Sequence, residues 1–413
     1  SLADQLITLP VPGEAATARL VSRNSGEIMD LRKLHDRPCR SCDGSVNGAN
    51  RAPGNRDESA MKPVLIAAML AVSVPAVAAP YSNIFVFGDS LSDRGNLAET
   101  GFLQTSAGLP VTNYPDPPSN HDSFTNGPVA VQVLAQSYGL TADPSVFVTG
   151  FKDVNGLFGG LSYVPGTNYA VAGATSAAAP AAGGVPGANL PQQVGAYGQE
   201  SGARADPNAL YILFAGGNDV RNAALAGTGA SAVTAGVNAE VNALTTLEIA
   251  GAKKFLVVNV PDVGNIPEFQ KFNPTKAAAA TTYSQQYDTQ LAAGVATATT
   301  AGVSVVSFDL YQFANAIQAA ALAGQLPINN TTDYCYTQTP LSTATTAACG
   351  PNAQNIGQLY FWDAIHPTGY VQNLWGQGFA QALAGQALTL PVPAPAGAAV
   401  AGLLAMLAWR RRA

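Results

Sequence analysis

The sequence predicts an α/β fold, a three-layer α/β/α sandwich with a central, mostly parallel sheet. Two observations lead to this prediction. Short apolar runs typical of buried strands alternate with longer helical segments, which is the pattern of a parallel sheet covered on both faces. Polar turns also follow two of these runs directly, and the carboxyl ends of parallel strands share one edge of the sheet.

Four apolar runs are expected to form the strands, and the helices follow them along the chain. The expected strands cover residues 83–87, 210–214, 254–260 and 303–308. The expected helices cover residues 129–138, 231–250, 275–299, 311–323 and 368–388. A proline in the first turn marks the start of the first helix, apolar residues at helical spacing indicate 231–250, and 275–299 is rich in alanine. Residues 101–122 and 173–191, rich in small residues and proline, are expected to be long loops that frame a cleft.

The N-terminal part of the chain carries the features of an export signal. Met61 and Lys62 precede a short apolar run and then small residues up to Ala79, which predicts a secretory signal peptide over 61–79 with cleavage near Ala79. The 60 residues before it begin with Ser1 and show no sustained periodicity. We interpret residues 1–60 as non-native or upstream sequence without ordered structure, with translation starting at Met61.

The C-terminal residues 391–413 predict a second targeting signal. A proline-rich hinge precedes the apolar run 396–409, and three arginines follow it. This order is typical of a membrane-stop signal with its arginines on the cytoplasmic side. It resembles the PEP-type C-terminal sorting signals of Gram-negative bacteria, although Ala394 stands where that family usually has glutamate. An ordinary tail-anchored helix is the alternative. We expect transient membrane association through this segment.

Residues 80–390 form the body of the protein and are expected to fold as one domain. They hold 8 lysine and arginine residues against 18 acidic ones, a net charge near −10. This balance, with no basic patch, excludes nucleic acid as an expected partner. We expect an exported monomer, located in the periplasm, at the cell surface or outside a Gram-negative cell.

The body contains two cysteines, Cys335 and Cys349. In an oxidising compartment they are expected to form a disulfide that closes a loop of about 15 residues and contributes roughly 3 kcal/mol. A metal site is the weaker interpretation, because no histidine or third cysteine accompanies the pair. No metal or organic cofactor is expected.

Three residues have the chemistry of a nucleophilic hydrolase. Ser90 follows the first expected strand, and Asp363 and His366 lie three positions apart far downstream. A serine hydroxyl needs a base to remove its proton, and the base needs a partner that fixes its tautomer. The body has only one other histidine, His121, in a loop rich in Pro and Asn, so His366 is the expected base. Ser90 and Asp363 could instead cap helices.

Four sequence blocks, taken in order, resemble the GDSL or SGNH esterase-lipase family. Residues 88–93 read Gly-Asp-Ser-Leu-Ser-Asp and look like the first block. Residues 168–175, 216–219 and 363–368 resemble the second, third and last blocks, and 119–128 is similar to a further family stretch. Any single block is a weak signal, whereas four in the family's order are specific. The Gly-x-Ser-x-Gly motif of many other serine hydrolases does not occur in this chain.

The resemblance implies a flavodoxin-like sheet and a site with residues in defined roles. Ser90, Asp363 and His366 would form the catalytic triad. The amides of Ser90 and Gly173 and the side chain of Asn218 would form the oxyanion hole. Gly173 could be glycine for backbone reasons alone, and Asn218 could simply satisfy a turn. Asp89 and Asp93 are expected to hold the turn around Ser90 rather than to act in catalysis.

The expected function is an exported serine esterase or lipase that cleaves carboxylic esters through an acyl-enzyme on Ser90. The subgroup it resembles most is the secreted bacterial lipolytic enzymes and phospholipase-like haemolysins. The substrate could be a lipid, a short-chain ester, a polyester or an acylated glycan. Two alternatives remain: an O-acetylesterase of surface polysaccharide, and a non-catalytic cell-surface binding protein on the same scaffold.

Overall fold

The computed structural model describes residues 80–99, 123–145, 166–177, 188–335 and 358–391. Its centre is a parallel sheet of four strands in the order β1-β2-β3-β4. The strands are β1 (Ile84–Gly88), β2 (Leu210–Phe214), β3 (Lys254–Val258) and β4 (Ser304–Phe308). They pair in register over all of their residues, so their carboxyl ends lie at one edge of the sheet. The predicted α/β fold with a parallel sheet is confirmed, and β3 ends two residues earlier than expected.

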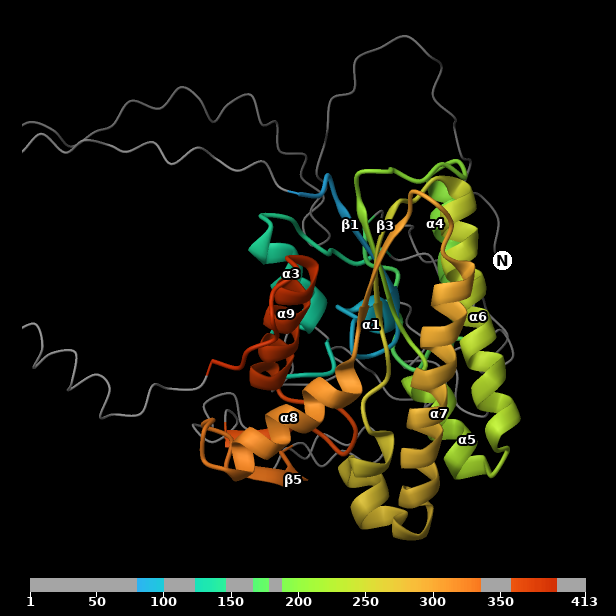
Figure 1. Cartoon of the computed structure of the whole chain (residues 1–413). Helices are drawn as coiled ribbons and strands as arrows, with labels where there is room; N and C mark the ends of the chain where they lie inside the picture. The colour runs from blue at the N-terminus through green and yellow to red at the C-terminus, as the bar shows by residue number, and fades with distance from the viewer. Residues whose placement is uncertain (1–79, 100–122, 146–165, 178–187, 336–357, 392–413) are drawn as a thin grey trace, which may run out of the picture. The chain divides into compact units, whose positions relative to one another are not determined.

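Helices cover both faces of this sheet, which makes three layers (Figure 1). On one face lie α3 (Ala130–Ser137) and α9 (Gly369–Leu383). On the other lie α4 (Leu190–Glu200), α6 (Ala230–Ala250) and α7 (Pro274–Ala298). Two more helices, α5 (Gly217–Ala226) and α8 (Leu310–Leu322), follow β2 and β4. The helices near 130, 240, 285 and 316 were therefore predicted correctly to within a few residues.

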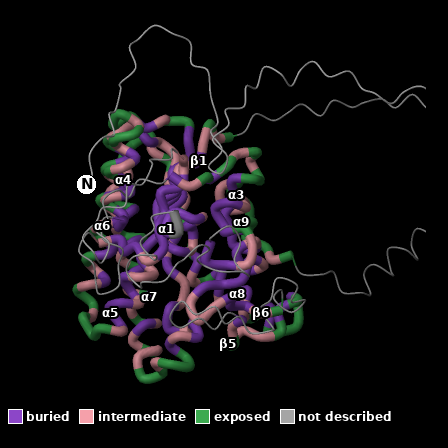
Figure 2. Tube along the Cα trace, turned by 180° about the vertical axis from the view of Figure 1, so that it is seen from behind, coloured by how far each residue is buried: buried purple, intermediate pink, exposed green. Residues whose placement is uncertain are grey.

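The sheet and the inward faces of the helices form the core (Figure 2). All five residues of β2 are buried, because this strand is covered on both faces and flanked by β1 and β3. The segment 167–171 runs beside β1 on its other side, where Val86 N donates to Thr167 O at 2.9 Å and Tyr169 N donates to Val86 O at 2.8 Å. This pairing brings the second sequence block next to the first.

Several elements differ from the sequence expectation. Helix α4 begins at Leu190, inside the predicted loop, and contains Gly195 and Gly198, which lower its intrinsic propensity. Its inward side chains are buried, so packing stabilises this helix. Helix α9 ends five residues earlier than predicted, where Gly385 adopts φ +64° and terminates it. Helix α5 was not predicted from the sequence.

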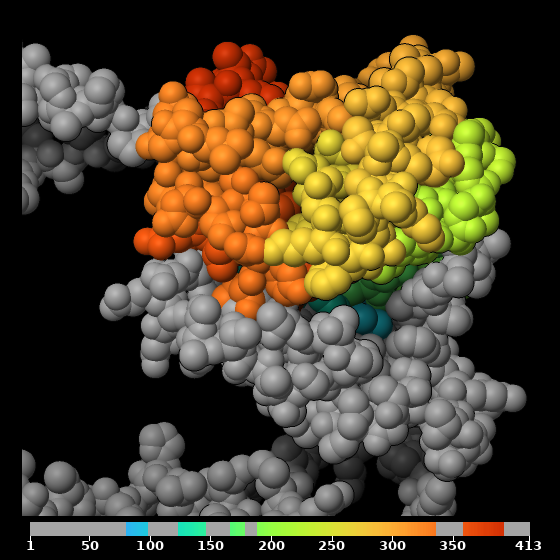
Figure 3. All heavy atoms as spheres, turned by 90° about the horizontal axis from the view of Figure 1, so that it is seen from below, coloured from blue at the N-terminus to red at the C-terminus, as the bar shows by residue number. Residues whose placement is uncertain are grey.

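Short elements without a clear pattern were missed as well. They are the helix α1 (Asn96–Glu99), the 3₁₀ turn η2 (Val263–Asn265), the π-helix η3 (Glu268–Phe272) and the strands β5 (Asn330–Tyr334) and β6 (Leu359–Phe361). The last two strands form a separate parallel pair. The carboxyl edge of the main sheet is formed in part by these segments, and there the residues after β3 lie against the segment containing α8 (Figure 3).

Several predictions fall outside the described residues. They concern the leader 1–60, the signal peptide 61–79, nearly all of the C-terminal signal 391–413, the loop 101–122, His121 and Cys349. Cys335 is buried, and its pairing with Cys349 stays a prediction. Among the described helices, none combines the length and the apolar character needed to cross a membrane.

Candidate active site

Ser90 lies in a tight turn directly after β1. Ser92 N and Asp93 N both donate to the Asp89 carbonyl, at 3.0 and 2.9 Å, and this turn holds the serine side chain above the sheet edge. Gly88 precedes the turn, and a Cβ at this position would lie 2.1 Å from the Phe214 carbonyl oxygen of β2. Only glycine allows this close approach, which explains the residue type two positions before the serine.

The Asp93 carboxylate ties this turn to the segment beside β1. It accepts hydrogen bonds from Gly95 N, Asn96 N and Leu97 N, at 2.8, 2.6 and 3.1 Å, and from Ala172 N at 2.7 Å. Burial raises the pKa of Asp93 to about 6, although these four N–H groups oppose the rise. Asp93 thus has the supporting position expected from the sequence, and it also positions the loop that contains Gly173.

His366 and Asp363 lie in the loop between β6 and α9. The Asp363 Oδ2 atom lies 2.7 Å from His366 Nδ1, while its Oδ1 accepts from Ile365 N at 2.7 Å and His366 N at 2.6 Å. On the other side of the ring, His366 Nε2 lies 2.7 Å from Ser90 Oγ. Residues separated by 276 positions therefore meet within hydrogen-bond distance, in the order carboxylate, imidazole, hydroxyl.

A stretch before α3 holds the histidine loop in place. The Phe124 ring lies 5.1 Å from the His366 ring, and Thr125 Oγ1 donates to Pro367 O at 3.0 Å. Asn126 Oδ1 accepts from Gly369 N at 2.7 Å. The sequence analysis noted this stretch only as similar to the family. Its polar, glycine-containing pattern was the available signal, but the contact with residue 366 is not visible in the chain order.

The three expected oxyanion donors come from three segments. Asn218, at the start of α5, lines the same pocket as Ser90 and His366, and its Nδ2 donates to Ala174 O at 2.9 Å. Gly173 precedes Ala174 and has φ +80°, a conformation that favours glycine. Gly173 does not line that pocket. Within the described part of the chain, the N–H groups of Ser90 and Gly173 donate to no acceptor.

Comparison with known proteins gives the same family as the sequence blocks. Residues 84–379 match the family of GDSL-like Lipase/Acylhydrolase proteins, more than half of the chain. The chain belongs to the GDSL-like lipase/acylhydrolase family. In this GDSL-family protein, the fold brings the four sequence blocks together at one edge of the sheet.

Three relatives show how far this likeness extends. Lipase 1 of Photorhabdus luminescens is 31% identical over 217 residues, which are 51% of this chain and 27% of that protein. An uncharacterized protein in the trpE-trpG intergenic region of Pseudomonas putida is 31% identical over 204 residues, 47% of this chain and 31% of that protein. Inactive GDSL esterase/lipase-like protein 23 of Arabidopsis thaliana is 28% identical over 226 residues, 51% of this chain and 52% of that protein. The matches thus span about half or less of each relative.

Behind the GDSL-family site lies a chain of buried acidic and hydroxyl groups. The Asp219 carboxylate accepts from Ser176 N at 2.7 Å and Ala177 N at 3.2 Å, and so fixes the loop after Gly173 to α5. Ser176 Oγ lies 2.9 Å from the Tyr287 hydroxyl, which donates to Glu240 Oε2 at 2.5 Å. Sequence reasoning missed these residues, because their contacts join α5, α6 and α7.

Burial raises the pKa values of the carboxyl groups in this buried cluster. Glu240 is fully buried, and its desolvation together with the nearby carboxylates of Asp219 and Asp89 raises its pKa to about 8. Burial also raises the pKa of Asp219 to about 6 and that of Asp89 to about 7. At neutral pH Glu240 is therefore mainly protonated and binds Tyr287 as a neutral group.

In Glu240→Gln, the free energy of unfolding is expected to decrease less steeply as the pH rises. The folded state holds the Glu240 proton more tightly than the unfolded chain, whose pKa is near 4.5. The stabilisation that comes from protonated Glu240 is therefore fully present below pH 4.5, and it is lost as the pH rises to about 8. Glutamine keeps an acceptor for Tyr287 without the titrating proton, so the slope of unfolding free energy should fall by up to about 1.4 kcal/mol per pH unit. Urea unfolding at several pH values measures this slope, and equal slopes in both proteins would contradict the assignment.

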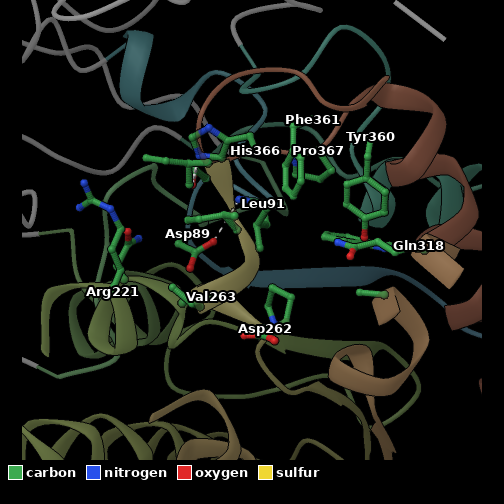
Figure 4. A pocket seen from close by; sticks show the side chains of 18 of the residues that line it. Asp89, Leu91, Arg221, Asp262, Val263, Gln318, Tyr360, Phe361, His366 and Pro367 are labelled. Carbon is green, nitrogen blue, oxygen red and sulfur yellow. Dashed lines mark hydrogen bonds between the residues drawn. The ribbon is translucent and has the colours of Figure 1, made fainter. Parts of the chain in front are cut away.

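A pocket opens beside Ser90 and His366 at the carboxyl edge (Figure 4). Much of its wall is apolar, including Leu91, Val263, Ile266 and Ile365. Arg221 also lines it, and its Nε donates to Glu268 Oε2 at 2.5 Å as part of a two-point ion pair. Within the described residues, no group of three or more His, Cys, Asp or Glu side chains is arranged to hold a metal ion.

Proposed function

We propose that this protein is a serine esterase or lipase that hydrolyses carboxylic esters through an acyl-enzyme intermediate on Ser90. The observation that carries the proposal is the alignment of three groups: His366 lies 2.7 Å from Ser90 Oγ through Nε2 and 2.7 Å from Asp363 through Nδ1. Membership of the GDSL-like lipase/acylhydrolase family and the likeness to Lipase 1 support the same class of reaction.

The mechanism follows from these contacts. Nε2 of neutral His366 takes the Ser90 proton as Oγ attacks the ester carbonyl carbon, and the tetrahedral oxygen becomes negative. Collapse of this intermediate breaks the carbon–oxygen bond of the ester, and His366 returns the proton to the leaving alcohol. In the second half of the reaction, His366 takes a proton from water as the water oxygen attacks the acyl carbon. The bond from this carbon to Ser90 Oγ then breaks, His366 returns the proton to Oγ, and the carboxylic acid leaves. Asp363 stabilises the imidazolium ion and holds it toward Ser90.

The negative oxygen of the intermediate needs donors already in position. We assign this role to the N–H groups of Ser90 and Gly173 and to Asn218 Nδ2, which retains one proton beyond the bond to Ala174. Asn218→Ala is therefore expected to lower kcat about a hundredfold with little change in KM. Steady-state hydrolysis of a p-nitrophenyl ester measures this effect, and an unchanged kcat would remove Asn218 from the oxyanion hole.

Export and subgroup are part of the proposal and rest on sequence patterns. The apolar run after Met61 supports a secretory signal, and the Pro-rich, apolar and Arg-rich order of 391–413 supports a PEP-type sorting signal or a tail anchor. We place the protein with the secreted lipolytic enzymes, in the periplasm, at the surface or outside a Gram-negative cell. Proteolytic mapping of both ends of the secreted protein tests these assignments.

Two other functions have a specific reason to be considered. A surface-polysaccharide O-acetylesterase fits a sorting signal linked to polysaccharide export. A non-catalytic binding protein is a second candidate, since the name of the Arabidopsis relative shows that inactive proteins occur in the family. The complete set of Ser90, His366 and Asp363 contacts favours an enzyme.

A fluorophosphonate probe separates the enzyme from the binding protein. We expect covalent labelling of Ser90 in the folded, full-length protein, because His366 activates its hydroxyl. Peptide mapping by mass spectrometry identifies the labelled residue, and heat-unfolded protein is the control. Absence of labelling in the folded protein would favour the binding function. Turnover of acetylated xylan compared with p-nitrophenyl esters separates the O-acetylesterase from a general esterase.

A further inference from the structure

Away from the catalytic residues, the pocket contains a tyrosine whose hydroxyl proton has no acceptor among the described residues. Tyr360, on β6, is 2% exposed and lines the pocket. Burial raises its pKa above the usual value, so the hydroxyl keeps its proton. The side chains of Gln318 and Trp375 donate to the oxygen of this hydroxyl. Figure 4 shows Tyr360 and Gln318 pointing toward one another, across the pocket from His366 and Arg221.

Gln318 and Trp375 hold the hydroxyl oxygen of Tyr360. Gln318 Oε1 accepts from Asn265 Nδ2 at 2.7 Å, so its NH₂ group is the side of the amide that faces the Tyr360 oxygen. Trp375 is 2% exposed, and its indole N–H, the one donor of that side chain, faces the same oxygen. A buried donor without an acceptor costs about 1–3 kcal/mol. With its oxygen occupied by these two donors, the Tyr360 hydroxyl has its own proton left to donate, which favours a bound group with an acceptor oxygen.

The charges around the pocket favour a neutral acceptor over a carboxylate. Asp89 and Asp262 line the pocket, and the Arg221 guanidinium is paired with Glu268. Apart from Arg221, no lysine or arginine among the described residues lines the pocket to compensate a buried negative charge. A ketone, ether or hydroxyl oxygen can accept from the donors without this penalty.

The pocket also limits the size of the group that it can hold. Its volume is about 60 Å³. One water-sized group takes about 10–15 Å³ on the same measure, so the pocket has room for roughly four to six non-hydrogen atoms. Longer acyl chains would have to leave the pocket or displace its wall.

We propose that this pocket holds the acyl group of the ester, and that the Tyr360 hydroxyl, held by Gln318 and Trp375, selects short acyl groups carrying a neutral oxygen acceptor at their far end. This inference rests on the proposed esterase function and specifies its substrate class as short oxo-, alkoxy- or hydroxyacyl esters. Tyr360 acts on specificity and does not touch the reacting atoms.

A matched pair of esters tests the selection. Ethyl 4-oxopentanoate and ethyl 4-methylpentanoate have the same chain length and the same number of non-hydrogen atoms, and they differ in a ketone oxygen that replaces a methyl group. We expect kcat/KM to be about threefold to tenfold higher for the oxo ester in the unmodified protein. In Tyr360→Phe this ratio should fall to within about twofold of unity, whatever the change in the absolute rates.

The controls separate the possible outcomes. Tyr283→Phe, on α7 and away from the pocket, should keep the full preference. If Tyr360→Phe also loses activity on p-nitrophenyl acetate, Gln318→Leu on α8 provides the same comparison. Two results would overturn the proposed acyl selection and leave the esterase function standing. One is equal kcat/KM for both esters in the unmodified protein, and the other is an unchanged ratio of kcat/KM in Tyr360→Phe. Failure to cleave any ester, including p-nitrophenyl acetate, would overturn the proposed function as well.

Discussion

Ser90→Ala is expected to lower kcat for p-nitrophenyl butyrate by about a millionfold, to the level set by binding and the oxyanion donors. The reaction loses its nucleophile, while the fold loses one small hydroxyl and its bond to His366. Unfolding free energy should therefore change by no more than about 1 kcal/mol. Steady-state kinetics together with thermal unfolding measures both quantities on the same preparation.

Ser92→Ala is the matched control for this variant. Ser92 is fully buried two residues away, and its Oγ has no hydrogen-bond partner within the described residues. Removal of this hydroxyl should leave kcat close to that of the unmodified protein. Substantial turnover by Ser90→Ala, beyond a trace of unmodified protein, would show that another residue is the nucleophile.

Asp363→Asn is expected to lower kcat by about ten-thousandfold and to leave KM nearly unchanged. Two backbone N–H groups, from Ile365 and His366, donate to one carboxylate oxygen of Asp363. They should hold the amide oxygen of asparagine in that place, so that its NH₂ group faces His366 Nδ1. Nδ1 must then accept a hydrogen bond, which puts the ring proton on Nε2, where it cannot take the Ser90 proton.

The size of this effect distinguishes the orienting role from a structural one. Asp143→Asn, which removes an exposed carboxylate paired with Arg94, is the control and should change kcat less than twofold. If Asp363→Asn lowered activity only in proportion to a loss of folded protein, measured by circular dichroism, Asp363 would be a helix cap and not a partner of the base.

The order of elements could be predicted because it depends on local pattern. A run such as 210–214 is apolar at every position, and a strand covered on both faces requires this. The long helices α6 and α7 were visible for the same reason. Helix α4 was hidden, because its glycines weaken the helical signal and its stability comes from packing.

The residues of the candidate site were also visible, but their supports were not. Ser90, Asp363 and His366 were indicated by residue type and spacing, and His366 also because the chain has only three histidines. The clamp of Asp219 on Ser176 and the contact of Phe124 with His366 join segments far apart in the sequence. No local pattern encodes which buried partner each of these side chains meets.

The sequence by itself determined the class of fold, the sheet edge on which the reactive groups lie, and the types of those groups, because strand and helix patterns are local and each motif block that resembles the family is a short contiguous stretch. Only the tertiary structure decided the distances between the groups, the protonation of buried Glu240 and the gathering of donors around Tyr360. These properties depend on desolvation and on contacts between distant segments, which arise only when the helices pack on the sheet.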